Sequence, residues 1–347
     1  MEFLAEVVAR AQRPPCLLVG RQAVDWHGVP VFAQTTPRGW KTLSPNLLSV
    51  LLPSGKKFVA QLDSEEGLDV FREKIFISHW QHCDNDDPVD FKIVKISAGG
   101  GLNNVCAALQ EYLGPLFPLF FVSCQQNKVI PRNLILWHEA TQRSLILRES
   151  VKNDLNFEVF EKALTNANPV VFISVTAPEF FEHALSKPGE KWLNLSDSTL
   201  CTLRDHPTLL RSIVANADLV ICNRVEARLA STSLLKMARN TCVTLGPSGL
   251  LFFVNGQVGH VPAFRVDGRH LPGTGDVLVA GLTLLRVFGD WDLFLQQPQV
   301  VFRIAQAFPA AFVQNGRVSL LQAVLEVLKG GEIRDEAPEF SAVWSPR

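Results

Sequence analysis

From about residue 98 onward, short apolar runs alternate with segments whose apolar residues recur at helical spacing. The runs are rich in Val, Ile, Leu and Phe and are bounded by turn residues, so they predict strands. They include residues 118–124, 170–175, 191–196, 219–223 and 241–246. Buried strands separated by helices predict an α/β protein with a mainly parallel central sheet and helices on both of its faces. Ligands of such sheets bind at the carboxyl ends of the strands.

The first 97 residues are less regular. Residues 16–20 (CLLVG) predict a strand, residues 47–62 a β pair, and residues 68–80 a helix. Two hairpins, at 133–149 and 248–264, interrupt the later alternation and suggest an added β element or lid. The second hairpin turns on Asn255-Gly256, a strong hairpin signal. We expect one domain over residues 1–331, with lid elements around 26–95 and 130–150, and a surface tail over 332–347.

A formal net charge of -1 gives no electrostatic case for binding nucleic acid or an anionic membrane. An anionic ligand must therefore be held by local geometry and a metal ion. The seven cysteines lack metal-ligand spacing, and several lie in apolar runs, which favours buried free thiols in a reducing compartment. The N-terminus does not resemble a secretory signal, and no apolar run is long enough to span a bilayer. We expect a cytoplasmic protein.

The segment at 266–282, VDGRHLPGTGDVLVAGL, combines a strand end, a loop and a helix start. Gly273, Thr274 and Gly275 can turn backbone N–H groups toward one point, and the helix dipole adds to the attraction for an anion. Asp276, in the first helical turn, could accept a proton from an attacking hydroxyl. The alternative is a glycine loop whose Asp only favours the helix start.

Two further segments follow buried strands. Asn223 and Glu226 come directly after LVICN, where they could organise a Mg²⁺ water shell near phosphates or could simply cap the next helix. The strand that contains Thr244 ends in a tight loop between Gly246 and Gly249. A nucleotide could lie against that loop, and an ordinary turn is the alternative.

Glycines and polar side chains also follow two strands nearer the N-terminus. Gly99 and Gly100 precede Asn104, whose amide could bridge neighbouring hydroxyls as donor and acceptor. A glycine turn with an Asn at the helix start would have the same pattern. Asp25 follows the first strand and could accept hydrogen bonds from sugar hydroxyls or lie in a solvated loop.

The order and spacing of these five segments resemble the ribokinase/PfkB carbohydrate kinase family over nearly the whole chain. Gly20 and Asp25 match the family's first strand and its substrate-binding Asp, and Gly99, Gly100 and Asn104 match its G-G-x-x-x-N. The remaining motifs match in the same order: Asn223 and Glu226 to N-x-x-E, Thr244, Gly246 and Gly249 to the nucleotide loop, and Gly273–Asp276 to G-A-G-D.

Three departures from the family are clear. His270 and Leu271 stand where many members have Asp-Thr. Asp267 precedes Gly273 by six residues, which looks more like the vitamin kinases for hydroxymethylpyrimidine and pyridoxal. The stretch between Asp25 and Gly99 is also longer than the family usually needs, and we expect residues 35–90 to enlarge the lid or form a dimer contact.

The resemblance implies a ribokinase-like three-layer α/β/α fold with a β lid. It implies an ATP-dependent kinase that transfers the γ-phosphate to an alcohol group of a sugar or nucleoside, with Mg²⁺, and leaves open a monovalent cation and a homodimer formed through the lid. Asp276 would be the base, Gly273–Asp276 the anion hole, and Asp25, Gly99, Gly100 and Asn104 the acceptor site. A vitamin-type kinase and a non-catalytic ligand-binding member of the fold are the alternatives.

Overall fold

The computed structural model describes twelve stretches of the chain: residues 16–30, 40–44, 47–51, 57–61, 91–125, 132–138, 143–148, 157–165, 167–204, 206–267, 272–315 and 321–333. The expected helix at 68–80, residues 268–271 and the tail from residue 334 lie outside these stretches.

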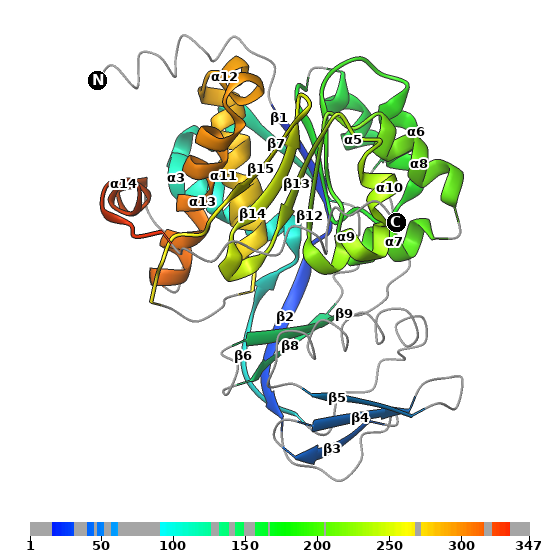
Figure 1. Ribbon diagram of the computed structural model, residues 1–347. Coiled ribbons are helices and arrows are strands. Elements are labelled where there is room, and N and C mark those ends of the chain that lie inside the picture. The colour runs from blue at the N-terminus through cyan, green and yellow to red at the C-terminus, as the bar shows by residue number, and fades with distance from the viewer. Residues whose placement is uncertain are drawn as a thin grey trace.

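An eight-stranded sheet forms the centre of the molecule (Figure 1). Its strands, in spatial order, are β15 (Gln257–Val261), β14 (Leu250–Val254), β13 (Asn240–Thr244), β12 (Leu219–Asn223), β11 (Lys191–Asn194), β10 (Val170–Ile173), β1 (Cys16–Gly20) and β7 (Phe121–Gln125). The strands from β13 to β7 are parallel, while β14 and β15 pair antiparallel at one edge. The predicted mainly parallel sheet is confirmed.

Strand β1 shows why this sequence builds a sheet covered on both faces. Successive side chains of a strand point to opposite faces, so an uninterrupted apolar run supplies both. Cys16 and Leu18 are buried in one core cluster, and Leu17 and Val19 in the other. Burying one such leucine stabilises the fold by about 1.5–3 kcal/mol.

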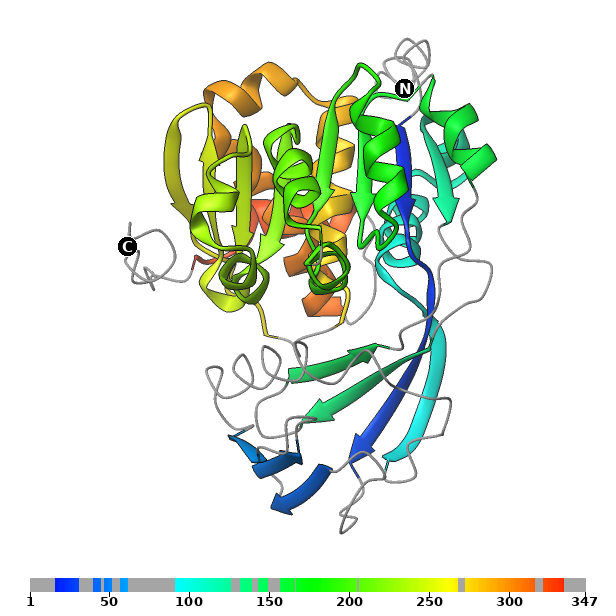
Figure 2. The same cartoon turned by 90° about the vertical axis from the view of Figure 1, so that its right-hand side faces the viewer.

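Helices form the two outer layers (Figures 1 and 2). One core cluster joins the sheet to α3 (Gly101–Leu113), α4 (Phe117–Phe120), α11 (Thr274–Phe288), α12 (Trp291–Gln296), α13 (Pro298–Asn315) and α14 (Leu321–Gly330). The other joins it to α5 (Phe157–Leu164), α6 (Pro178–Leu185), α7 (Asp197–Leu203), α8 (Pro207–Ala215), α9 (Arg224–Ala230) and α10 (Thr232–Leu235). None of the helices in the described stretches is long and apolar enough to cross a membrane.

Two smaller sheets lie beyond the carboxyl ends of the parallel strands (Figures 1 and 2). One has the order β6 (Phe91–Gly99), β2 (Ala23–Pro30), β8 (Arg132–His138), β9 (Arg143–Arg148), and the other the order β3 (Trp40–Ser44), β4 (Leu47–Leu51), β5 (Lys57–Gln61). Strand β2 begins three residues after β1 ends, so one chain segment runs from the main sheet into the smaller one.

The two predicted hairpins have different places. The hairpin of β8 and β9 belongs to the smaller four-stranded sheet, whereas β14 and β15 extend the main sheet, so the second hairpin is not a separate lid element. A strand was expected to end near Val266. Instead β15 ends at Val261, and Phe264 makes an isolated bridge to Ile333.

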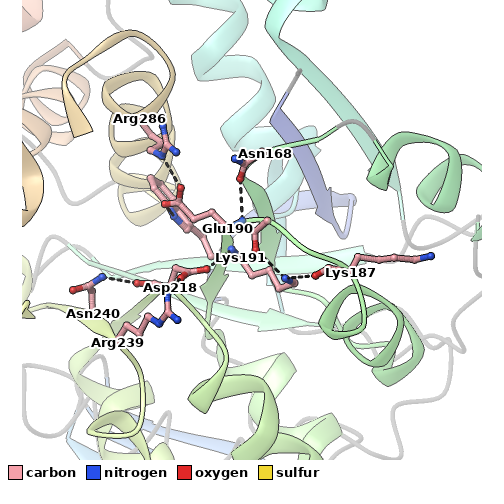
Figure 3. Close-up of polar contacts among 10 residues, drawn as sticks. Asn168, Lys187, Glu190, Lys191, Asp218, Arg239, Asn240 and Arg286 are labelled. Atoms are coloured by element: carbon pink, nitrogen blue, oxygen red, sulfur yellow. Dashed lines mark hydrogen bonds and ion pairs between the residues drawn. The ribbon is translucent and has the colours of Figure 1, made fainter. Parts of the chain in front are cut away.

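A band of polar contacts joins the amino ends of the parallel strands, at the edge opposite the smaller sheets (Figure 3). The backbone N–H of Glu190 donates to Asn168 Oδ1 at 2.9 Å, and that of Lys191 donates to Asp218 Oδ2 at 2.8 Å. Glu190 Oε2 also accepts from Arg286 Nε at 2.7 Å. Arg286 lies in the last turn of α11, so this ion pair fixes the end of α11 that is far from its first turn.

Candidate active site

Helix α11 begins at the carboxyl edge of the sheet, and its first turn carries the Gly273–Asp276 segment. Gly273 is the N-cap and has φ 88°, a left-handed conformation that glycine adopts without strain. A methyl group added to Gly273 would lie 3.1 Å from Asn104 Nδ2. The loop therefore needs glycine here for its backbone angle and for its close approach to α3.

Asp276 and Asn104 are joined directly. Asn104 Nδ2 donates a hydrogen bond to Asp276 Oδ2 at 2.7 Å. The two residues stand 172 positions apart in the chain, so only the tertiary fold brings these two predicted motifs together. The bond occupies one carboxylate oxygen of Asp276 and fixes the orientation of the other, Oδ1.

The run of glycines before α3 lets three other segments approach its backbone. A methyl group on Gly99 would overlap the carboxyl group of Asp25, which is buried. One on Gly100, whose φ is 83°, would lie within 3 Å of the backbone of Arg21 and Ala23. The structure thus places Asp25, Gly99 and Gly100 against one another.

Gly101 lies beside Asp276, the candidate base, and beside Ser174, a residue that the motifs did not indicate. A methyl group on Gly101 would lie 3.3 Å from Asp276 Oδ1 and 3.1 Å from the hydroxyl of Ser174. Ser174 directly follows β10, at the carboxyl end of the strand. That position after a buried strand is the one signal by which the sequence could have indicated it.

Asn223 and Glu226 form a complete capping box at the start of α9. Asn223 Oδ1 accepts from the backbone N–H groups of Val225 and Glu226, each at 2.9 Å. The Glu226 carboxylate accepts from the N–H of Asn223 at 2.6 Å and from the N–H of Asp197 at 3.2 Å. Direct ligation of a metal ion would compete with these bonds, so this pair fits a contact through water better than a direct one.

The nucleotide-loop candidates lie after β13. Thr244 ends the strand, and its hydroxyl lies 3.5 Å from the carbonyl of Cys222. A 3-10 turn from Gly246 to Ser248 follows, and Gly249 has φ 93°. A methyl group on Gly249 would overlap the carbonyl oxygen of Val261 in β15, whereas one on Gly246 would meet no atom within 4 Å. Gly249 is thus needed for packing, and Gly246 leaves open space.

The described residues hold no cluster of three His, Cys, Asp or Glu side chains that could bind a metal ion. Five cysteines are free: Cys16, Cys124, Cys222 and Cys242 are buried, and Cys106 is partly buried. Burial raises the pKa of the Cys106 thiol to about 12 and that of Cys124 to about 11. These thiols remain protonated at neutral pH.

No protein-family model matches the sequence, and no curated protein matches it in a sequence search. Solved structures do match the fold. Ribokinase from Thermotoga maritima superposes with a TM-score of 0.57 and 12% sequence identity, over 91% of this chain and 100% of that one. The chain has the ribokinase-like fold.

Two other structures support the same conclusion. Phosphofructokinase-2 from Escherichia coli, in complex with substrates and products, matches with a TM-score of 0.52 and 15% identity, over 91% of this chain and 98% of that one. A nucleoside kinase from Methanocaldococcus jannaschii, an archaeal member of the ribokinase family, matches with a TM-score of 0.50 and 13% identity, over 91% and 99%. The ribokinase-like α/β/α fold expected from the motifs is confirmed.

Proposed function

We propose that this protein is an ATP-dependent kinase that transfers the γ-phosphate to an alcohol group of a sugar or nucleoside. The observation that carries the proposal is the hydrogen bond between Asn104 and Asp276 at the first turn of α11. It joins the expected acceptor-binding segment to the expected base, and Gly273 lies beside both.

Asp276 is the proposed general base. Its Oδ2 is held by Asn104, which leaves Oδ1 oriented toward Gly101 and Ser174. An acceptor hydroxyl at Oδ1 would give up its proton as its oxygen attacks the γ-phosphorus. A positioned general base contributes about 10²–10⁴-fold to a rate.

The proposed anion hole is the backbone of Gly273–Asp276. The first N–H groups of a helix have no intrahelical partner and point at the space before it, where the helix dipole also attracts negative charge. Side-chain bulk is low there: a methyl group on Gly275 would meet no atom within 4 Å. Fixed N–H donors of this kind stabilise charge on a transferring group without reorganisation.

The acceptor is proposed to lie between Asp276 and the glycine run, with Asp25 and Asn104 as polar contacts. Asp25 comes from β2 of the smaller four-stranded sheet, which lies across from the carboxyl edge (Figures 1 and 2). This sheet is proposed to act as the lid that keeps water from the γ-phosphate. A dimer contact through the lid and its extension, β3 to β5, is part of the same proposal.

ATP is proposed to lie along the C-terminal half of the edge, near Thr244, Gly246 and Gly249. Solved kinases share the fold, which supports ATP as the phosphoryl donor. Mg²⁺ bound to ATP would supply charge neutralisation, and Asn223 and Glu226 would contact it through water. A structure of Escherichia coli phosphofructokinase-2 in complex with potassium shares the fold, which supports testing a monovalent cation.

The test is ADP release from Mg-ATP with a panel of sugars, nucleosides, and pyrimidine or pyridine alcohols. The proposal predicts release only when a sugar or nucleoside is present. Release with the heteroaromatic alcohols alone would instead identify a vitamin-type kinase. Folded protein that binds neither ATP nor any acceptor would be a non-catalytic member of the fold.

A further inference from the structure

The 246–249 loop between β13 and β14 has an open side and an anchored side. Gly246 is exposed, and a methyl group added to it would meet no atom within 4 Å. A methyl group added to Gly249 would lie 2.1 Å from the carbonyl oxygen of Val261, in β15. A ligand can therefore approach the loop at Gly246, while the other end of the loop packs against β15.

A histidine side chain of β15 holds the anchored side. His260 Nε2 lies 2.7 Å from the backbone carbonyl oxygen of Ser248. A carbonyl oxygen only accepts, so Nε2 carries a proton and donates it. The N–H group of the same peptide unit, that of Gly249, donates to the carbonyl of Gly246 at 3.0 Å. Because a peptide unit is planar, His260 fixes the open end of the loop through one rigid group.

Strand β15 is itself fixed, so it can hold the loop in place. It pairs with β14 along its whole length. Helix α13 binds the end of β15 from the other side: Gln306 Nε2 donates to the Val261 carbonyl at 3.0 Å, and Arg303 donates to the Pro262 carbonyl at 2.7 Å. His260 directly precedes these two anchored carbonyls. Its hydrogen bond thus ties the loop to a rigid part of the fold.

We propose that His260 is a positioning residue for the nucleotide, and that it acts through the Ser248–Gly249 peptide to hold Gly246 where ATP binds. This inference rests on the proposed kinase activity, and it assigns His260 no contact with ATP. Without the hydrogen bond the loop must be ordered as ATP binds, and that ordering lowers the affinity. The proposed base lies on α11, so the steps after ATP binding do not depend on His260.

The test compares His260→Ala and His260→Gln with the wild type, by calorimetric titration with Mg-ATP. Steady-state kinetics use the acceptor that gives the fastest ADP release in the panel above. Mg-ATP should bind about 3–10-fold more weakly to His260→Ala, the effect of one typical hydrogen bond. His260→Gln should recover most of the affinity, because its side chain also ends in an N–H donor. The kcat at saturating Mg-ATP and the KM for the acceptor should not change.

Gln257→Ala is the matched control. Gln257 lies at the other end of β15, and its side chain also donates to a backbone carbonyl, that of Gln296, at 3.4 Å. This variant should bind Mg-ATP as the wild type does. Urea unfolding checks that each variant is folded. His260→Asn, whose amide is too short to reach Ser248, replaces His260→Ala if that variant does not fold.

The outcomes separate the two proposals. Wild-type affinity for Mg-ATP in His260→Ala, even with a lower free energy of unfolding, would overturn the role of His260 and leave the kinase standing. Equal losses of affinity in His260→Ala and His260→Gln would overturn the hydrogen bond as the cause. A wild type that does not bind Mg-ATP would overturn both proposals.

Discussion

Asn104 Nδ2 lies 2.7 Å from Asp276 Oδ2, and this hydrogen bond connects the first turn of α3 to the first turn of α11. Both helices begin at the carboxyl edge of the main sheet. The bond holds the proposed base in one orientation, with its other oxygen turned toward Gly101.

Replacing Asn104 by Ala should therefore lower kcat/KM by about 10–100-fold, because the proposed base is no longer held in one orientation. Asn103→Ala is the control: Asn103 is the neighbour in the same helical turn, but its amide donates to the Gly99 carbonyl at 2.8 Å. It should lower kcat/KM much less. Steady-state kinetics measure this, and wild-type kcat/KM in Asn104→Ala would contradict the assignment.

Gly273 and Gly275 should respond differently to alanine. Gly273→Ala introduces a left-handed alanine and brings a methyl group to 3.1 Å from Asn104 Nδ2, so it should destabilise the fold by about 1–2 kcal/mol and disturb the Asn104–Asp276 bond. Gly275→Ala meets no atom and should retain stability, yet lower kcat because its methyl group enters the proposed anion hole. Urea unfolding and steady-state kinetics separate the two effects. Wild-type kcat in Gly275→Ala would argue against an anion hole there.

The ion pair between Arg286 and Glu190 should contribute to stability and not to catalysis. Their side chains are only 19% and 15% exposed, and Glu190 also accepts from Trp192 Nε1 at 2.6 Å. Glu190→Gln should lower the free energy of unfolding by about 1–3 kcal/mol. Arg239→Gln, which breaks the pair with Asp218 where Arg239 is 76% exposed, should cost under about 1 kcal/mol. The free energy of unfolding is measured by urea denaturation. Equal losses for Glu190→Gln and Arg239→Gln would mean that the buried ion pair contributes no more than the exposed one.

Burial raises the pKa of the Cys106 thiol from the usual 9.0 to about 12. The protonated thiol stabilises the fold fully below pH 9, and this contribution is lost as pH rises from 9 toward 12, where the unfolded chain ionises first. At pH 8 this higher pKa makes the thiolate form of Cys106 about 1,000-fold rarer in the folded protein than in the unfolded chain. Iodoacetamide should therefore label Cys106 far more slowly in folded than in unfolded protein, as measured by peptide mapping. Equal rates would show that the thiol is accessible and ionised.

Much of the fold could be predicted because single segments carry its signals. The apolar run CLLVG supplies both faces of β1, and Asn255-Gly256 turns the β14–β15 hairpin as expected. Sequence pattern did not show that this hairpin extends the main sheet, because the same alternation suits a lid strand and an edge strand. Helix α7 was missed since it is short and follows β11 closely.

The site was predictable only in part. The glycines before Asn104 and Asp276 indicated two ligand-binding turns, and the fold brings these turns together. Asn223 and Glu226 could not be decided in advance, because the spacing that suits a metal water shell also forms the capping box that the structure contains. Ser174 was missed because its position beside Gly101, which Asp276 also approaches, depends on three segments that are distant in the sequence.

The central claim is that Asp276 activates the acceptor, and the most direct measurement is acceptor-dependent ADP release by Asp276→Asn beside the wild type, with Mg-ATP affinity measured on both by calorimetry. Asparagine keeps the size of the side chain and removes the basic oxygen. We predict unchanged affinity for Mg-ATP and a fall in kcat of at least about 10²–10⁴-fold. A variant that binds Mg-ATP and transfers phosphate at near the wild-type kcat would contradict the account.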